Sequence, residues 1–178
     1  MSYSQDIFNH TKATFERLAE IDKQIADAKS DSSMYSYQYN QERLGKLQEQ
    51  RETLIYESNK TADALLEEHK KKVHAEFMAK PEEITDDAKL LQSGIQFTNT
   101  ELEEMLDRYS GNRTMERVIW DHAKGKGIKL NRKSATEADK ILSAEQLRSY
   151  CRSAIQRPQY ADVWLSDSYF AEISQGVD

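Results

Sequence analysis

Proline and glycine are almost absent from the first half of this 178-residue sequence. The chain has two prolines, the first at Pro81, and a single glycine, Gly45, precedes it. Because these residue types end or destabilise helices, their scarcity permits long, uninterrupted helices over residues 1–80.

Cysteine and long apolar runs are also scarce. Cys151 is the only cysteine, which excludes an intramolecular disulfide and any zinc site built from several cysteines. No apolar run approaches the roughly 20 residues that span a bilayer. The N-terminal residues lack the basic and apolar segments of a signal peptide. We therefore expect a cytoplasmic protein.

The composition is polar, but it is not that of a disordered chain. Hydrophobic residues make up 38% of the sequence and charged residues 31%, with a mean hydropathy of −0.85. Such values are expected when many residues lie on exposed helix faces. The aromatic content of 9% and the regular apolar spacing indicate real packing around a thin core. Association with other chains would add to that burial.

Apolar residues recur at helical spacing through residues 1–80. We predict one helix over about residues 5–29 and a second over about residues 36–79. The second helix carries an approximate heptad seam, for which we expect a role in self-association. The seam consists of Leu44, Leu47, Leu54 and Leu65. Polar residues at Arg51 and Ser58 interrupt it, which disfavours a long parallel zipper and favours an antiparallel helical hairpin arm.

Residues 81–178 contain helix-capping and helix-ending residues at several positions, which predicts several short helices. Thr98 and Glu101, for example, have the spacing of a capping box, in which each residue satisfies a backbone amide of the other. The sequence shows no strand pattern. We therefore predict an all-α fold, with a long N-terminal hairpin or coiled-coil arm at 1–80 followed by a compact domain of short helices at 81–178.

The charges are arranged in blocks. The formal charge is −2 over residues 1–80, −6 over 81–123, +6 over 124–158 and −4 over 159–178. Such segregation is expected either to steer a partner and contact neighbouring copies, or to be neutralised within one fold. Both readings stay open at this stage.

Two segments of the second half are candidates for binding. The last twenty residues are rich in apolar side chains and predict a short helix that docks on a partner through Trp164 and Phe170. Residues 124–133 predict a flexible basic connector, which is either a solvated or partner-facing loop or a segment that contacts phosphates without reading sequence. Its cations are Lys124, Lys126, Lys129, Arg132 and Lys133.

No catalytic, cofactor-binding or metal site is predicted. His69 and His74 are five residues apart, so a helix turns them away from a shared metal ion. Arg148 and Arg152 would favour a thiolate at Cys151, but a lone cysteine on an amphipathic helix is more often a small packed residue.

Residues 90–130 resemble a segment of small helical proteins that tailed phages of Gram-positive bacteria encode near their virion-assembly genes. The matching features are Leu91-x-Ser93-Gly94-Ile95, Tyr109-x-Gly111-Asn112-x-Thr114-Met115 and a helix that closes at Gly127-Ile128. In those proteins, as here, a charged helical half precedes the segment. The resemblance implies a capsid-assembly or virion-associated role and brings no catalytic residues with it.

These patterns lead to one main expectation and one alternative. The main expectation is a non-enzymatic, scaffold-like or virion-associated assembly protein that acts through self-association and protein contacts. Its expected partners are further copies of itself and a coat or portal protein. The alternative is a nucleic-acid-binding accessory protein that uses residues 124–133.

Overall fold

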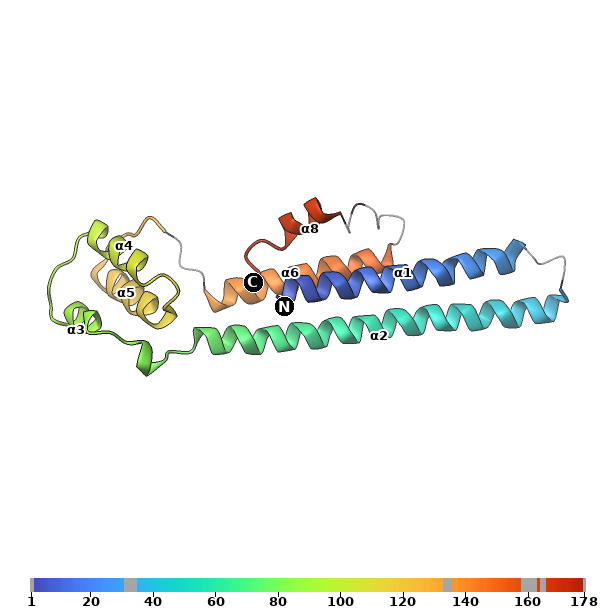
Figure 1. Cartoon of the computed structure of the whole chain (residues 1–178), viewed down its shortest axis with the longest axis horizontal. Coiled ribbons are helices and arrows are strands. Elements are labelled where there is room, and N and C mark those ends of the chain that lie inside the picture. Colours follow the sequence, from blue (N-terminus) through green and yellow to red (C-terminus); the bar gives the residue numbers. More distant parts are fainter. Residues whose placement is uncertain (1, 31–34, 133–135, 158–162, 164–165, 178) are drawn as a thin grey trace. The chain divides into compact units, whose positions relative to one another are not determined.

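The computed structural model describes residues 2–30, 35–132, 136–157, 163 and 166–177, and every regular element in these ranges is a helix (Figure 1). The all-α prediction is confirmed. The elements are α1 (Tyr3–Ser30), α2 (Tyr37–Phe77), the 3-10 helix η2 (Pro81–Glu83), α3 (Asp87–Gln92), α4 (Asn99–Arg108), α5 (Arg113–Lys126), α6 (Glu137–Gln156) and α8 (Asp167–Ile173). They form two compact units. Unit 1 comprises residues 1–70 and 138–178, and unit 2 comprises residues 71–137.

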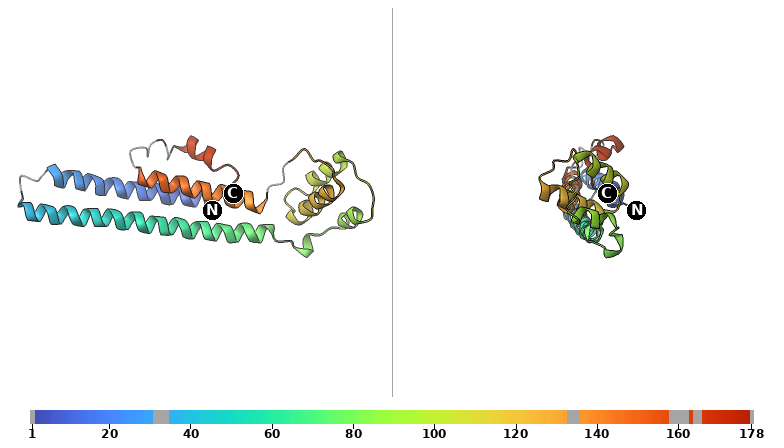
Figure 2. Two further views of the ribbon diagram at one scale, coloured as in Figure 1. Left: turned by 180° about the vertical axis from the view of Figure 1, so that it is seen from behind. Right: turned by 90° about the vertical axis from the view of Figure 1, so that its left-hand side faces the viewer.

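Unit 1 is built around the antiparallel pair of α1 and α2. Helix α6 lies along the first half of α1 and the facing part of α2, and α8 lies over this layer (Figures 1 and 2). The main core combines residues from all four helices. It consists of Tyr3, Ile7, Ala62, Leu66, Ala144, Leu147, Cys151 and Val177, with Leu65, Phe170 and Ile173 packed against it.

The structure corrects the predicted domain boundary near residue 80, because residues 138–178 belong with the hairpin. Helix α6 buries Leu147 completely in the core of unit 1. Two ion pairs join α6 to α2. Glu145 of α6 pairs with Lys70 of α2 at 2.8 Å, and Arg148 of α6 pairs with Asp63 of α2 at 2.5 Å. The physical reason is that α1 has a wide apolar face in its first half, which α2 alone does not cover.

Unit 2 packs α3, α4 and α5 around a separate core. That core consists of Leu91, Leu102, Met105, Leu106, Ile119, Ala123 and Leu130. The capping box of α4 is present, with the Thr98 hydroxyl accepting from the Glu101 amide and the Glu101 carboxylate accepting from the Thr98 amide. Helix α5 ends at Lys126, because Gly127 supplies the left-handed conformation (φ 67°) that closes the helix.

Candidate interaction surface on the helical hairpin

The burial of α1 changes sharply along its length. Eight of the residues from 3 to 18 are buried, whereas Ala28 alone is buried among residues 19–30. Figure 1 shows the reason, since α6 accompanies the first half of α1 and the hairpin continues beyond it as two helices. We call residues 19–30 and 37–57 the distal hairpin. At its inner end, Leu54 and Ile55 still cluster with Ile155 of α6.

The seam leucines are used within the chain. Leu47 and Leu54 are buried, with exposed fractions of 8% and 6%, and Leu44 and Leu65 are half-buried. Leu54 packs with Leu18, fully buried, in a small cluster of unit 1. Of the four leucines predicted to form a self-association seam, Leu47 and Leu54 are therefore covered within the chain, and Leu65 packs against the main core of unit 1.

The polar residues of the seam also find partners within the hairpin. Arg51 donates a hydrogen bond of 2.7 Å to the Asp22 carboxylate of α1. The Ser58 hydroxyl lies 2.9 Å from the Thr14 hydroxyl and 2.9 Å from Nε2 of His10. Because buried polar groups are costly without partners, these contacts set the register of α1 against α2. The antiparallel hairpin thus gives the polar residues of the seam their hydrogen-bond partners without a parallel zipper.

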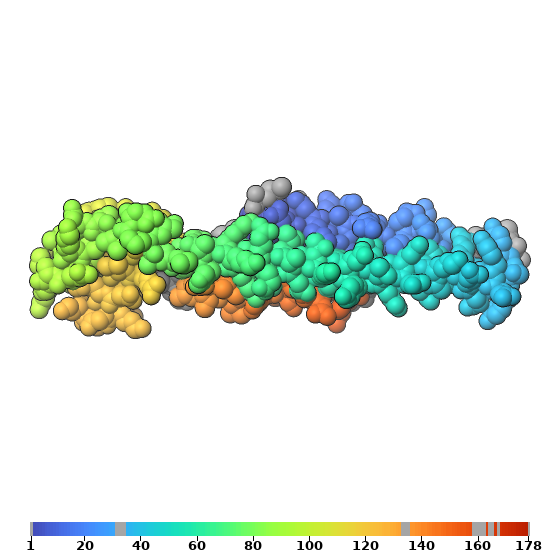
Figure 3. All heavy atoms as spheres, turned by 90° about the horizontal axis from the view of Figure 1, so that it is seen from below, coloured from blue at the N-terminus to red at the C-terminus, as the bar shows by residue number. Residues whose placement is uncertain are grey.

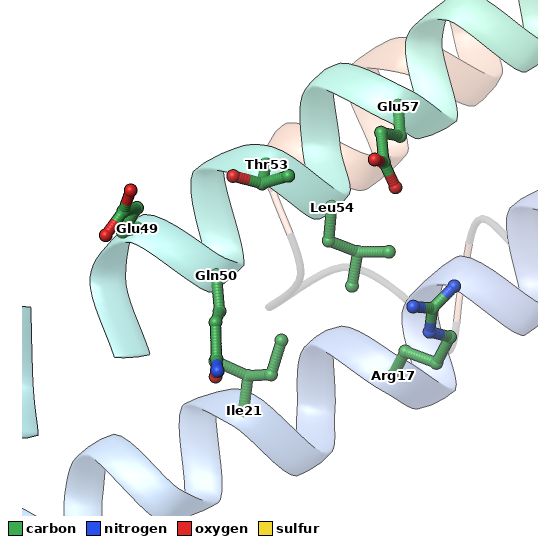
Figure 4. Close-up of a pocket in the computed structure, with 7 residues that line it drawn as sticks. All are labelled: Arg17, Ile21, Glu49, Gln50, Thr53, Leu54 and Glu57. Carbon is green, nitrogen blue, oxygen red and sulfur yellow. The ribbon is translucent and has the colours of Figure 1, made fainter. Parts of the chain in front are cut away.

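A groove of about 440 Å³ runs between α1 and α2 where the distal hairpin begins (Figure 4). Its lining consists of Arg17, Ile21, Glu49, Gln50, Thr53, Leu54 and Glu57. Ile21 and Leu54 form its apolar floor, and Arg17 and Glu57 extend toward the same end. A second hollow of about 220 Å³ follows toward the turn of the hairpin and shares Gln50 with the first. Both hollows therefore lie along α2, one on each side of Gln50.

Six of the α2 residues that line one or the other hollow form a regular stripe. Its members are Tyr39, Arg43, Lys46, Gln50, Thr53 and Glu57. They follow one another at steps of four, three, four, three and four, so they lie on one face of α2, beside the leucine seam. We call this set the polar stripe. Figure 3 shows α2 between α1 and α6, so this helix presents a long open side along unit 1.

Exposed aromatic side chains are concentrated on the distal hairpin. Tyr37, Tyr39 and Tyr56 have exposed fractions of 80%, 54% and 70%. The ring of Tyr35 stacks at a tilt on that of Tyr39, with centroids 5.3 Å apart. Tyrosine is enriched in protein interfaces because it buries a large area with few rotatable bonds. The structure thus leaves these aromatic side chains on the surface of the distal hairpin.

The predicted docking segment at the C-terminus is only partly described. A short helix, α8, does form in the last twenty residues. Phe170 does not point to a free surface, because its ring lies 4.3 Å from that of Phe8 and packs on the core of unit 1. Trp164 lies outside the described residues. The docking role expected for Phe170 is therefore replaced by a structural one.

The predicted basic connector is not a free loop over residues 124–132. Lys124 and Lys126 lie in the last turn of α5, and the next residues pack along α4. Asn131 donates its amide to Glu103 at 2.7 Å, and Arg132 pairs with Asp107. Lys133 lies outside the described residues.

This packing weakens the case for phosphate contacts. Lys124, Lys126 and Lys129 remain exposed, but Arg132 forms an ion pair with the carboxylate of Asp107. The acidic block thus neutralises part of the basic block inside unit 2. A surface for phosphate needs several cations together, without adjoining carboxylates.

The surroundings of Cys151 disfavour a nucleophilic role. The thiol is buried, and this burial raises its pKa, with a smaller opposing effect from a hydrogen bond with Thr11 and the charge of Arg148. Cys151 is therefore the small packed residue that the sequence favoured, since desolvation outweighs the favourable charge of Arg148. No group of three or more potential metal-ligating side chains occurs in the part of the chain that the structure describes.

The remaining histidines make packing or surface contacts. His69 stacks on Tyr3 with ring centroids 4.6 Å apart, and His122 meets the edge of Phe97. Nδ1 of His74 lies 2.9 Å from the Glu137 carboxylate. The structure brings none of these rings together.

No protein-family model matches the chain, and no similar protein is found among curated proteins or solved structures. Within the described residues, no helix is both long and apolar enough to cross a membrane.

Proposed function

We propose that this chain is a non-enzymatic assembly protein that acts in the host cytoplasm through self-association and protein contacts. The observation that carries the proposal is the distal hairpin, which extends beyond α6 and exposes a groove and three tyrosines. Helices with so narrow a buried face gain stability when further helices pack against them.

The resemblance of residues 90–130 to small phage proteins gives this proposal its biological setting. A scaffold-like role in virion assembly needs weak, reversible self-association and a second contact with a coat or portal protein. A polar groove suits such a role, since obligate interfaces are larger and more apolar. We therefore assign self-association to the distal hairpin and not to the leucine seam.

Sedimentation equilibrium over a wide range of concentrations tests the proposal. We expect the average mass to rise from the 20.6 kDa monomer toward a dimer or higher oligomer. Tyr39→Ser is expected to weaken the association. Tyr150→Ser is the matched control, because that tyrosine has a similar exposed fraction of 41% but lies on α6. A chain that stays monomeric at the highest concentration would refute the proposal.

A further inference from the structure

The charges along the groove are not evenly distributed. Toward the turn of the hairpin, the hollow is bordered by one anion and two cations: Glu42, Arg43 and Lys46. Toward the other end it is bordered by two anions and one cation: Glu49, Glu57 and Arg17. The two halves therefore have opposite net charge, and Gln50, an uncharged residue that lines both hollows, lies between them.

The polar stripe repeats this asymmetry about the same residue. Arg43 and Glu57 are each seven residues from Gln50, one toward the turn and one away from it. Seven residues are two helical turns, or about 10.5 Å, so all three side chains lie on one face of α2. A helix with this arrangement is complementary to a copy of itself that runs in the opposite direction.

We propose, on the basis of the proposed self-association, that two copies pair through their distal hairpins about a two-fold axis at Gln50. The α2 helices are antiparallel in this dimer, and the two hairpins form a four-helix bundle. Arg43 of each copy lies against Glu57 of the other, and Lys46 lies near Thr53. A two-fold dimer makes each of these contacts twice.

The parallel arrangement is disfavoured by the same charges. It would set Arg43 and Lys46 of one copy against the same two cations of the other. Like charges that meet in an interface exclude an orientation, whereas exposed ion pairs add little affinity. The charges thus select the antiparallel register. The half-buried Ile21, which lines the groove, and the exposed Tyr39 supply the apolar contact.

Charge reversal of the full-length chain tests the register. Arg43→Glu and Glu57→Arg are each expected to raise the dimer dissociation constant roughly tenfold, because each replaces two attractions by two repulsions. The double variant R43E/E57R is expected to return to within about threefold of the wild type, since the pair is restored with its signs exchanged. Far-UV circular dichroism checks that each variant remains helical.

A control pair on α1 separates this effect from a general change of charge. Lys12 and Glu16 are exposed and lie four residues apart on α1, outside the groove. Lys12→Glu, Glu16→Lys and their combination are expected to leave the dissociation constant unchanged. If the Arg43 and Glu57 variants change the dissociation constant no more than these control variants do, the antiparallel register is refuted. The proposed function would still stand.

Cross-linking gives a second readout that does not depend on affinity. Copies that carry Arg43→Cys, mixed with differently tagged copies that carry Glu57→Cys, are expected to join through a short bis-maleimide. The native Cys151 is buried and does not compete. Efficient cross-linking of Arg43→Cys copies to one another, without the mixed product, would show a parallel dimer and refute the inference. A wild type that never associates would instead refute the proposed function itself.

Discussion

Replacing Leu147 by alanine is the most direct test of the architecture, because this residue carries α6 into the core of unit 1. Its side chain has no exposed surface and packs with residues of α1 and α2. The change removes three carbon atoms, which account for about 2.5 kcal/mol of transfer free energy at about 0.8 kcal/mol each. The cavity left between three helices raises the expected loss of unfolding free energy to about 3–4 kcal/mol.

Leu142→Ala on the same helix is the matched control. Leu142 is 54% exposed, so its truncation is expected to cost less than about 0.5 kcal/mol. Urea and thermal unfolding, followed by far-UV circular dichroism, compare the two variants. For a unit of about this size we expect Leu147→Ala to lower Tm by roughly 12–16 °C. Equal midpoints for the two variants would show that α6 does not pack on the hairpin, and the division into units would be wrong.

Three further predictions concern single groups. Because burial raises the pKa of the Cys151 thiol, its reaction with a disulfide reagent at pH 8 is expected to be far slower in the native chain than in urea, and comparable rates would contradict its burial. Thr98→Ala is expected to destabilise unit 2 by about 1 kcal/mol through loss of the α4 cap, as read from Trp120 fluorescence in a Trp164→Phe background. Hydrogen bonds from the Thr98 amide and hydroxyl lower the pKa of the Glu101 carboxylate. The stability that this carboxylate contributes is therefore present above its unfolded pKa of about 4.5, and it is lost as the pH falls through the folded pKa. Glu101→Gln is therefore expected to flatten the acid dependence of unit 2 below that pH, and an unchanged slope would argue against this role.

Local features of the fold were predictable because they depend on neighbouring residues. The long helices follow from apolar spacing without proline, and the α4 cap follows from Thr98 and Glu101 alone. The position of α6 was not predictable in this way. Its buried face meets residues more than sixty positions away, such as Asp63 paired with Arg148, and no local pattern distinguishes that partner from a nearer one.

The candidate surface shows the same limit. Its residues were visible as polar positions of a helix, but the heptad spacing predicted self-association through the leucines. Only the fold of the hairpin shows that Leu47 and Leu54 are buried within the chain, and that the polar stripe beside them borders a groove. In the basic connector, likewise, Arg132 pairs with Asp107, which is a tertiary contact.

The sequence by itself determined that this chain is all-α, that its first eighty residues form two long helices, and that a capped short helix begins at Thr98. Those properties reside in backbone preferences and in spacings of three and four residues. The tertiary structure decided which apolar faces are covered, where α6 packs and which side of α2 stays open. Burial depends on what lies opposite a side chain in space, and α6 ends before the distal hairpin does.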